Sequence, residues 1–181
     1  EERRMMTALL TTNVTRFYRE PHHFDALRTA VLPDLIDKAR NGARVRIWSA
    51  GCSSGEEALT IAMETCALCP DVAKLNFRIL GTDLDPAVIQ IARRAEYDAS
   101  AVNNISGDKL ADFFEEIDSG GRFRASRKLR DLITYAELNL MQRWPMEGMF
   151  DVIFCRNVVI YFDPASQAAL WPRFAKALVP D

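Results

Sequence analysis

The sequence RIWSAGCSSGEEA, residues 46–58, combines a short apolar strand, a turn with two glycines and two serines, and the start of a helix. In an open α/β sheet, ligands bind beyond the carboxyl end of a strand, where the chain turns into the following helix. The turn contains neither the G-x-G-x-x-G pattern of dinucleotide-binding folds nor the G-x-x-x-x-G-K-[ST] pattern of phosphate-binding loops. These residues therefore predict a ligand-binding turn that does not hold its ligand by phosphate groups.

Strand and helix patterns alternate along the rest of the chain. Two of the expected helices begin with Asp-Pro, which supplies an N-cap and a favourable first helical residue. Such alternation predicts an α/β fold with a parallel sheet covered by helices on both faces. The expected strands cover residues 45–50, 75–84 and 150–159, and the expected helices cover residues 21–42, 54–68, 85–95 and 163–178, with Pro33 dividing the first helix.

The segment 96–138 interrupts this alternation, and we expect it to form a small subdomain inserted into the connections of the sheet. A helix is predicted over residues 106–117, followed by a turn, and short strands or a strand with a helical turn are predicted over residues 122–138. The basic side chains of this segment are expected on its surface. They are Arg122, Arg124, Arg127, Lys128 and Arg130.

The composition excludes several classes of protein. Hydrophobic residues make up 49% of the 181 residues, and the formal net charge of -2 gives no overall attraction to nucleic acid. No apolar run of about 18 residues and no secretory signal pattern occurs, so we expect no membrane insertion and a cytoplasmic location. Cys66 and Cys69 form a C-x-x-C pair without a second pair. That pattern favours packing over zinc binding, and no metal is predicted.

Acidic side chains indicate the kind of ligand. Glu56 and Glu57 begin the helix after the turn, where they would repel a diphosphate and suit a cationic group. Asp83 ends the next strand, where an acid in this type of fold holds the hydroxyls of a ribose, and Asp85 is expected to cap the following helix. A ribose beside a cation fits S-adenosylmethionine. On the loop alone, an alternative is equally open, in which the glutamates only improve the helix start and Asp83 is a turn residue.

Four segments give the sequence a resemblance to a known family. They are TTNVTRFYREPHHF (11–24), RIWSAGCSSGEEALTIAM (46–63), ILGTDLDPAVIQIARRAEYD (79–98) and FDVIFCRNVVIYFD (150–163). In order and spacing they resemble the chemotaxis receptor methyltransferase family, CheR. The resemblance implies a class I S-adenosylmethionine-dependent methyltransferase sheet, Rossmann-like, with a small inserted β-subdomain. It also implies the formation of glutamate methyl esters on chemoreceptor cytoplasmic domains, with S-adenosyl-L-methionine as donor and S-adenosyl-L-homocysteine as product.

The same resemblance assigns site residues, motif by motif. An N-terminal arm, residues 1–20, would contribute to the cofactor site of a catalytic domain formed by residues 21–181. Glu56 would contact the cofactor after the glycine turn, and Asp83 would hold its ribose. The expected cofactor-binding residues are Asn13, Thr15, Arg19, Gly51, Glu56, Asp83, Asn139, Leu140, Arg156 and Asn157.

The implied reaction requires few catalytic groups from the protein. A glutamate side chain has a reference pKa of about 4.3 and is already ionised at neutral pH, so its methylation requires no general base. We expect catalysis to come from alignment of the reacting groups and exclusion of water. Arg19 and Arg156 are the catalytic candidates, because one of them would orient the incoming carboxylate.

The chain departs from the family pattern at both ends. Family members normally carry an N-terminal helical domain implicated in receptor binding before TTNVTRF, and only a short segment precedes it here. At the other end the sequence stops at LVPD, and we expect the last strands of the sheet to be missing. The turn from Asp118 to Gly121 is shorter than in members that grip a C-terminal receptor tether, so tether-independent action is expected.

Two other functions are alternatives to methyl transfer. One is an S-adenosylmethionine-binding sensor or scaffold that does not methylate. The other is a nicotinamide-dependent oxidoreductase on the same fold class, which the missing G-x-G-x-x-G pattern disfavours.

Overall fold

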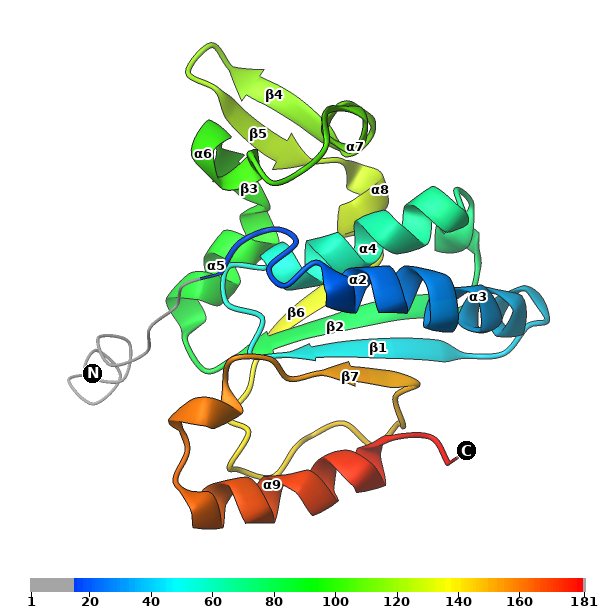
Figure 1. Ribbon diagram of the computed structural model, residues 1–181, viewed down its shortest axis with the longest axis vertical. Helices are drawn as coiled ribbons and strands as arrows, with labels where there is room; N and C mark the ends of the chain where they lie inside the picture. The colour runs from blue at the N-terminus through cyan, green and yellow to red at the C-terminus, as the bar shows by residue number, and fades with distance from the viewer. Residues whose placement is uncertain (1–14, 181) are drawn as a thin grey trace.

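The computed structural model describes residues 15–180, so the predicted site residue Asn13 lies outside it. The described residues form two sheets (Figure 1). The parallel sheet has the spatial order β6 (Ile133–Glu137), β2 (Phe77–Asp83), β1 (Val45–Ala50), β7 (Val152–Phe154). The antiparallel sheet has the order β3 (Glu96–Asp98), β5 (Arg122–Ala125), β4 (Phe114–Asp118).

Helices cover both faces of the parallel sheet, as predicted (Figure 1). One face carries α2 (His22–Ala26), α3 (Leu32–Arg40) and α4 (Glu56–Leu68), the opposite face carries α9 (Pro164–Ala177), and α5 (Pro86–Arg94) packs against β2 and β6. The Asp-Pro helix starts are confirmed, because Asp85 accepts a hydrogen bond from the Ala87 N–H and Asp163 accepts one from the Ser166 N–H. No helix in residues 15–180 is long and apolar enough to cross a membrane.

Strand β1 divides the hydrophobic interior into two cores. Successive side chains of a strand point to opposite faces, so Ile47 packs in the core beneath α4, whereas Trp48 packs in the core beneath α9. Both side chains are fully buried. The indole of Trp48 packs against the Phe174 ring of α9, and its Nε1–H donates to Thr82 Oγ1 at 2.9 Å. This residue therefore joins β1, β2 and α9.

The first helical segment is divided where the sequence predicts. A π-helical turn, η1 (Leu27–Val31), lies between α2 and α3 and ends two residues before Pro33. Proline has no backbone N–H, and in a regular α-helix its ring would clash with the carbonyl of Thr29, four residues earlier. The wider turn accommodates the proline without ending the helical path.

Two predicted elements are shorter than expected. The helix predicted over 106–117 is α7 (Gly107–Phe113), because the chain from Phe114 pairs as β4 with β5. The strand predicted over 150–159 is β7 alone, because Asn157 adopts a left-handed backbone with φ of 56° and turns the chain into the 3-10 turn η3 (Val159–Tyr161).

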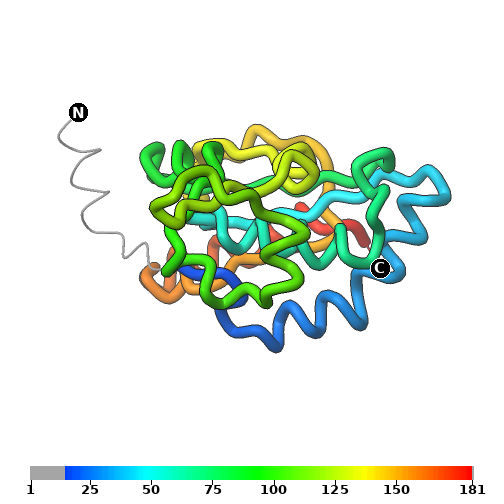
Figure 2. Tube along the Cα trace, turned by 90° about the horizontal axis from the view of Figure 1, so that it is seen from above, coloured from blue at the N-terminus to red at the C-terminus, as the bar shows by residue number. Residues whose placement is uncertain are grey.

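The inserted subdomain is also shorter than the predicted range of 96–138. Strand β6 pairs in parallel with β2, so it belongs to the main sheet. Besides its antiparallel sheet, the insertion contains the helices α6 (Ala99–Val102), α7 and α8 (Arg127–Arg130). Outside the insertion, η2 (Val72–Lys74) lies in the connection from α4 to β2. Seen from above, the insertion lies in front of α4, with the described start of the chain beside it (Figure 2). Phe17 contacts Tyr97 and Phe114 of the insertion edge-on, with ring centroids 5.0 and 5.6 Å apart.

The turn after β1 is tied to the end of β2. The Thr82 carbonyl accepts hydrogen bonds from the N–H groups of Gly51 and Cys52, at 2.7 and 2.8 Å. Gly51 has a φ of 84°, and a Cβ at this position would lie 2.2 Å from Cγ2 of Val158. Both the backbone conformation and the close approach therefore require glycine here.

Gly51→Ala tests this constraint. The left-handed conformation and the overlap with Val158 should together lower the free energy of unfolding by about 2–4 kcal/mol, measured by urea denaturation. Gly107→Ala is the matched control, because a Cβ there meets nothing within 4 Å. Alanine is the better helix former, so the control should be neutral or slightly stabilising. Equal effects of the two substitutions would contradict the assignment.

Candidate active site

A cavity of about 390 Å³ lies beyond the carboxyl ends of β1 and β2. Its volume is in the range of small-molecule sites. Its walls come from the N-terminal arm, the turn after β1, the end of β2 and the loops after β6 and β7. The predicted site residues that line it are Thr15, Arg19, Gly51, Asp83, Asn139, Leu140, Arg156 and Asn157. The structure therefore brings together segments that are far apart in the sequence.

Of the two glutamates after the turn, Glu57 faces this cavity and Glu56 does not. The Glu56 side chain is buried against the turn, where both carboxylate oxygens accept hydrogen bonds from Ser54 Oγ at 2.7 and 2.9 Å. Consecutive residues of a helix point about 100° apart, so only one of the pair can face a given site. The geometry favours Glu57 as the acid that faces a ligand, and the contact of Glu56 with the cofactor stays a prediction.

Glu57 and Arg156 form the charged end of the cavity. Glu57 Oε1 accepts a hydrogen bond from Ser49 Oγ at 2.7 Å, and its Oε2 accepts one from Arg156 at 3.2 Å. The guanidinium of Arg156 also donates to Glu20 Oε2 at 2.8 Å and to the Arg19 carbonyl. It thereby connects the loop after β7 to α4 and to the N-terminal arm. The Nε of Arg156 is buried and has no acceptor among the described residues.

Asp83 is held in a fixed orientation at the end of β2. Its Oδ2 accepts a hydrogen bond from the Ser53 N–H at 2.8 Å, and its Oδ1 accepts one from the Asp85 N–H at 3.1 Å. Burial raises the pKa of this carboxyl, and the backbone N–H groups partly oppose the shift. Burial also raises the pKa of Glu57, against the hydrogen bond from Ser49 and the positive charges of Arg156 and Arg19. Both carboxylates therefore lie in a partly dehydrated environment.

Sequence reasoning missed most of the apolar lining. These residues are Phe24, Leu84, Leu138, Met141, Val158 and Phe162. Four of the six, Leu84, Leu138, Met141 and Val158, adjoin a predicted site residue in the sequence, which is the signal that could have identified them. The chain also adopts left-handed backbone at several non-glycine positions in or beside the cavity. They are Tyr18, Glu20, Ser53 and Asn157. Such strain concentrates at functional sites. Of these four residues only asparagine is of a type that commonly adopts this conformation, so the sequence gives little indication of it.

The C-x-x-C thiols lie outside this cavity. Cys66 and Cys69 are both buried in the core beneath α4, as their predicted packing role requires. Within residues 15–180, no group of three or more His, Cys, Asp or Glu side chains is placed to hold a metal ion.

Fold and cavity together define a class of protein. The sheet order, a glycine turn without a phosphate-binding pattern, a carboxylate at the end of β2 and an acid at the start of α4 are features of an α/β nucleoside-binding domain of the class I methyltransferase type. The donor set suits a ribose at Asp83, a cationic group at Glu57 and an apolar ring among the leucines. The residues present therefore fit S-adenosylmethionine.

Residues 13–181 match the model of a protein family described as CheR methyltransferase, SAM binding domain. The chain belongs to this family, and S-adenosylmethionine is its cofactor. A probable chemotaxis protein methyltransferase of Rhizobium etli is 51% identical over 181 residues, which cover 99% of this chain and 67% of that protein. The chemotaxis protein methyltransferase of Escherichia coli K12 is 37% identical over 176 residues, 95% of this chain and 58% of that protein. The chain thus spans about two thirds or less of these relatives.

Among solved structures, magnesium protoporphyrin IX methyltransferase of Synechocystis PCC 6803 with bound SAH is 15% identical, with a TM-score of 0.44. The match covers 83% of this chain and 50% of that one. This score is too low to carry an inference, and the fold assignment stands on the sheet order and the family match.

The pH dependence of stability tests the environment of Asp83. Because burial raises its pKa, the folded protein binds this proton at a higher pH than the unfolded chain does. At a pH between the two pKa values, the folded state binds more protons than the unfolded state. The contribution of Asp83 to stability therefore rises as the pH falls through the folded-state pKa. Wild-type protein should gain stability relative to Asp83→Asn as the pH falls from neutral towards the unfolded pKa of about 4, measured by urea denaturation. A difference that is constant, or that changes in the opposite direction, would contradict the dehydrated environment.

A matched pair of variants distinguishes the two glutamates. Glu57→Gln should weaken the binding of S-adenosylhomocysteine about tenfold or more, because a charge-assisted contact at the cavity wall is lost. Glu56→Gln should change the dissociation constant much less, since its carboxylate contacts Ser54 and not the cavity. Isothermal titration calorimetry measures both constants, and a larger effect at Glu56 would support the sequence-based assignment instead.

Proposed function

We propose that this chain is the catalytic domain of a chemoreceptor methyltransferase that forms methyl esters on glutamate side chains. The observation that carries the proposal is the pairing, in one cavity, of Asp83 with the Glu57–Arg156 ion pair. This set of groups suits a nucleoside with a charged amino-acid end. The family match and the chemotaxis methyltransferase names of the relatives support methyl transfer to a chemoreceptor.

Three parts of the cavity would hold the cofactor. The Asp83 carboxylate would accept hydrogen bonds from the ribose hydroxyls, and Glu57 would face the ammonium group. Leu138 and Leu140 would contact the adenine, on a loop that the hydrogen bond from the Met141 N–H to Asn139 Oδ1 holds in place at 2.8 Å. When bound, S-adenosylmethionine supplies a methyl group activated by its sulfonium.

The protein would contribute alignment and not proton transfer. A glutamate carboxylate is ionised at neutral pH and needs no base. The contacts of Arg156 with Glu57, Glu20 and the Arg19 carbonyl support a role in forming the cavity wall. Arg19, which also lines the cavity, is the other candidate to orient the incoming carboxylate. The exposed Tyr161 lies at the rim, where the acceptor protein would enter.

The proposed partner is the cytoplasmic domain of a chemoreceptor, which places the reaction in the cytoplasm. We include tether-independent action in the proposal. Its support is the short connection between β4, which ends at Asp118, and β5, which begins at Arg122. The predicted division into an arm, residues 1–20, and a catalytic domain, residues 21–181, also stays a proposal.

A non-catalytic cofactor-binding sensor is the alternative, and one experiment separates the two functions. The protein is incubated with methyl-labelled S-adenosylmethionine and a receptor cytoplasmic fragment. Base-labile label on the fragment is the expected result, because glutamate methyl esters hydrolyse in alkali. Cofactor binding without transfer would favour the sensor. Asp83→Ala should abolish both binding and labelling, whereas the control Asp98→Ala, at an exposed position outside the cavity, should retain them.

A further inference from the structure

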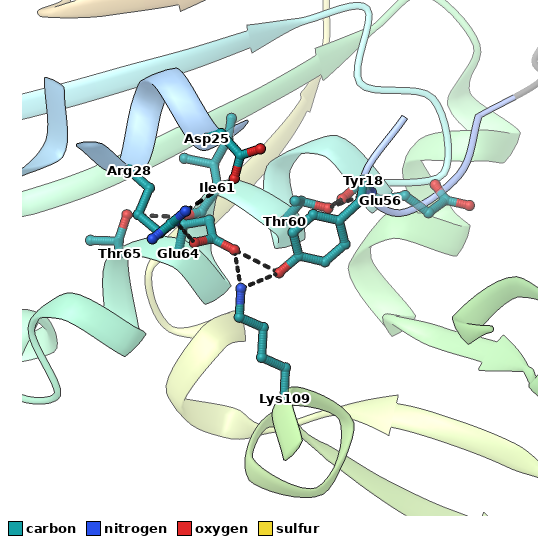
Figure 3. Close-up of polar contacts among 9 residues, drawn as sticks. All are labelled: Tyr18, Asp25, Arg28, Glu56, Thr60, Ile61, Glu64, Thr65 and Lys109. Atoms are coloured by element: carbon teal, nitrogen blue, oxygen red, sulfur yellow. Dashed lines mark hydrogen bonds and ion pairs between the residues drawn. The ribbon is translucent and has the colours of Figure 1, made fainter. Parts of the chain in front are cut away.

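Glu64 is a buried carboxylate that the cavity does not use. It lies in α4, its side chain is 2% exposed, and three side chains converge on it (Figure 3). The Tyr18 hydroxyl donates to Glu64 Oε1 at 2.7 Å, and the Lys109 ammonium donates to the same oxygen. Arg28 Nε lies 3.6 Å from the other oxygen. Burying a charge in this way is costly unless its partners are all in place.

Tyr18 belongs to the arm that forms one wall of the cavity. Its neighbours Arg16 and Arg19 line the cavity, and Tyr18 itself has a left-handed backbone with φ of 54°. Its backbone N–H donates to Thr60 Oγ1 at 3.4 Å, while its hydroxyl reaches Glu64 one turn further along α4. A conformation that costs free energy persists only where such contacts hold it.

Lys109 connects this cluster to the inserted subdomain. It lies on α7, and its ammonium donates to the Tyr18 hydroxyl at 3.1 Å as well as to Glu64. The ammonium also lies 5.0 Å from the centroid of the Tyr18 ring. Three parts of the chain, the arm, α4 and the insertion, therefore meet at one carboxylate (Figure 3).

We propose that Glu64 is a positioning residue: with Tyr18 and Lys109 it fixes the arm as a wall of the cofactor cavity, so that the inserted subdomain sets the affinity for the cofactor. The inference rests on the cavity as the cofactor site and not on methyl transfer. By linkage, a change that moves α7 changes cofactor affinity, and cofactor binding restrains α7 in return.

Tyr18→Phe and Lys109→Met test the proposal through binding of S-adenosylhomocysteine, measured by calorimetry. Each variant should weaken binding about tenfold. The double variant should weaken binding by less than the product of the two single effects, because both residues act through Glu64. Arg124→Met is the matched control, since Arg124 pairs with Glu96 inside the antiparallel sheet. It should leave the dissociation constant unchanged. Tyr18→Phe keeps the ring that packs on Phe24 and should remain folded even if Lys109→Met does not.

Tryptic cleavage after Arg16 and Arg19 gives a second measurement that does not depend on enzyme activity. Lys109→Met should speed this cleavage, and Arg124→Met should not. Unchanged affinity in folded Tyr18→Phe, or equal effects of the Lys109 and Arg124 variants, would overturn the proposal. A protein that binds S-adenosylhomocysteine in this pattern but transfers no methyl group would contradict only the proposed function.

Discussion

The close approach of Gly51 to Val158 is the contact on which the rest of the site depends. It allows the turn after β1 and the loop after β7 to meet, while the Thr82 carbonyl holds the same turn against the end of β2. Because all three strands are parallel, their carboxyl ends lie at one edge of the sheet. A side chain at position 51 would separate these loops and open the cavity at its base.

Buried carboxylates are distributed so that each has a separate set of partners. Asp83 is held by backbone N–H groups, Glu57 by Ser49 and Arg156, and Glu64 by Tyr18 and Lys109. Each of these three carboxylates has at least one partner from another segment of the chain. Ionic contacts of this kind contribute little net stability, but they fix which segments lie together. Here they fix the arm and the loop after β7 around the cavity.

Local patterns in the sequence were sufficient to predict the main helices and strands. Apolar periodicity, the Asp-Pro starts of α5 and α9 and the glycine turn are all properties of neighbouring residues. These patterns were not sufficient where contacts between distant residues determine the secondary structure of a segment or its partner in a sheet. The residues after Phe113 have a helical pattern but pair with β5, and β6 lies in the main sheet because its partner is β2. Which of Glu56 and Glu57 faces the cavity depends on the rotation of α4 about its axis. The identity of these residues does not indicate that rotation. The anchoring of Tyr18 by Lys109 links positions 91 residues apart.

The left-handed backbone at Tyr18, Glu20, Ser53 and Asn157 has a consequence for how this site tolerates sequence change. Glycine would relieve about 1 kcal/mol of strain at such a position, but it would increase the entropy of the unfolded chain by a similar free energy. The two effects nearly cancel. Relative to glycine, the side chains at these positions therefore add little net cost to stability, although their contacts must still hold the left-handed backbone in place.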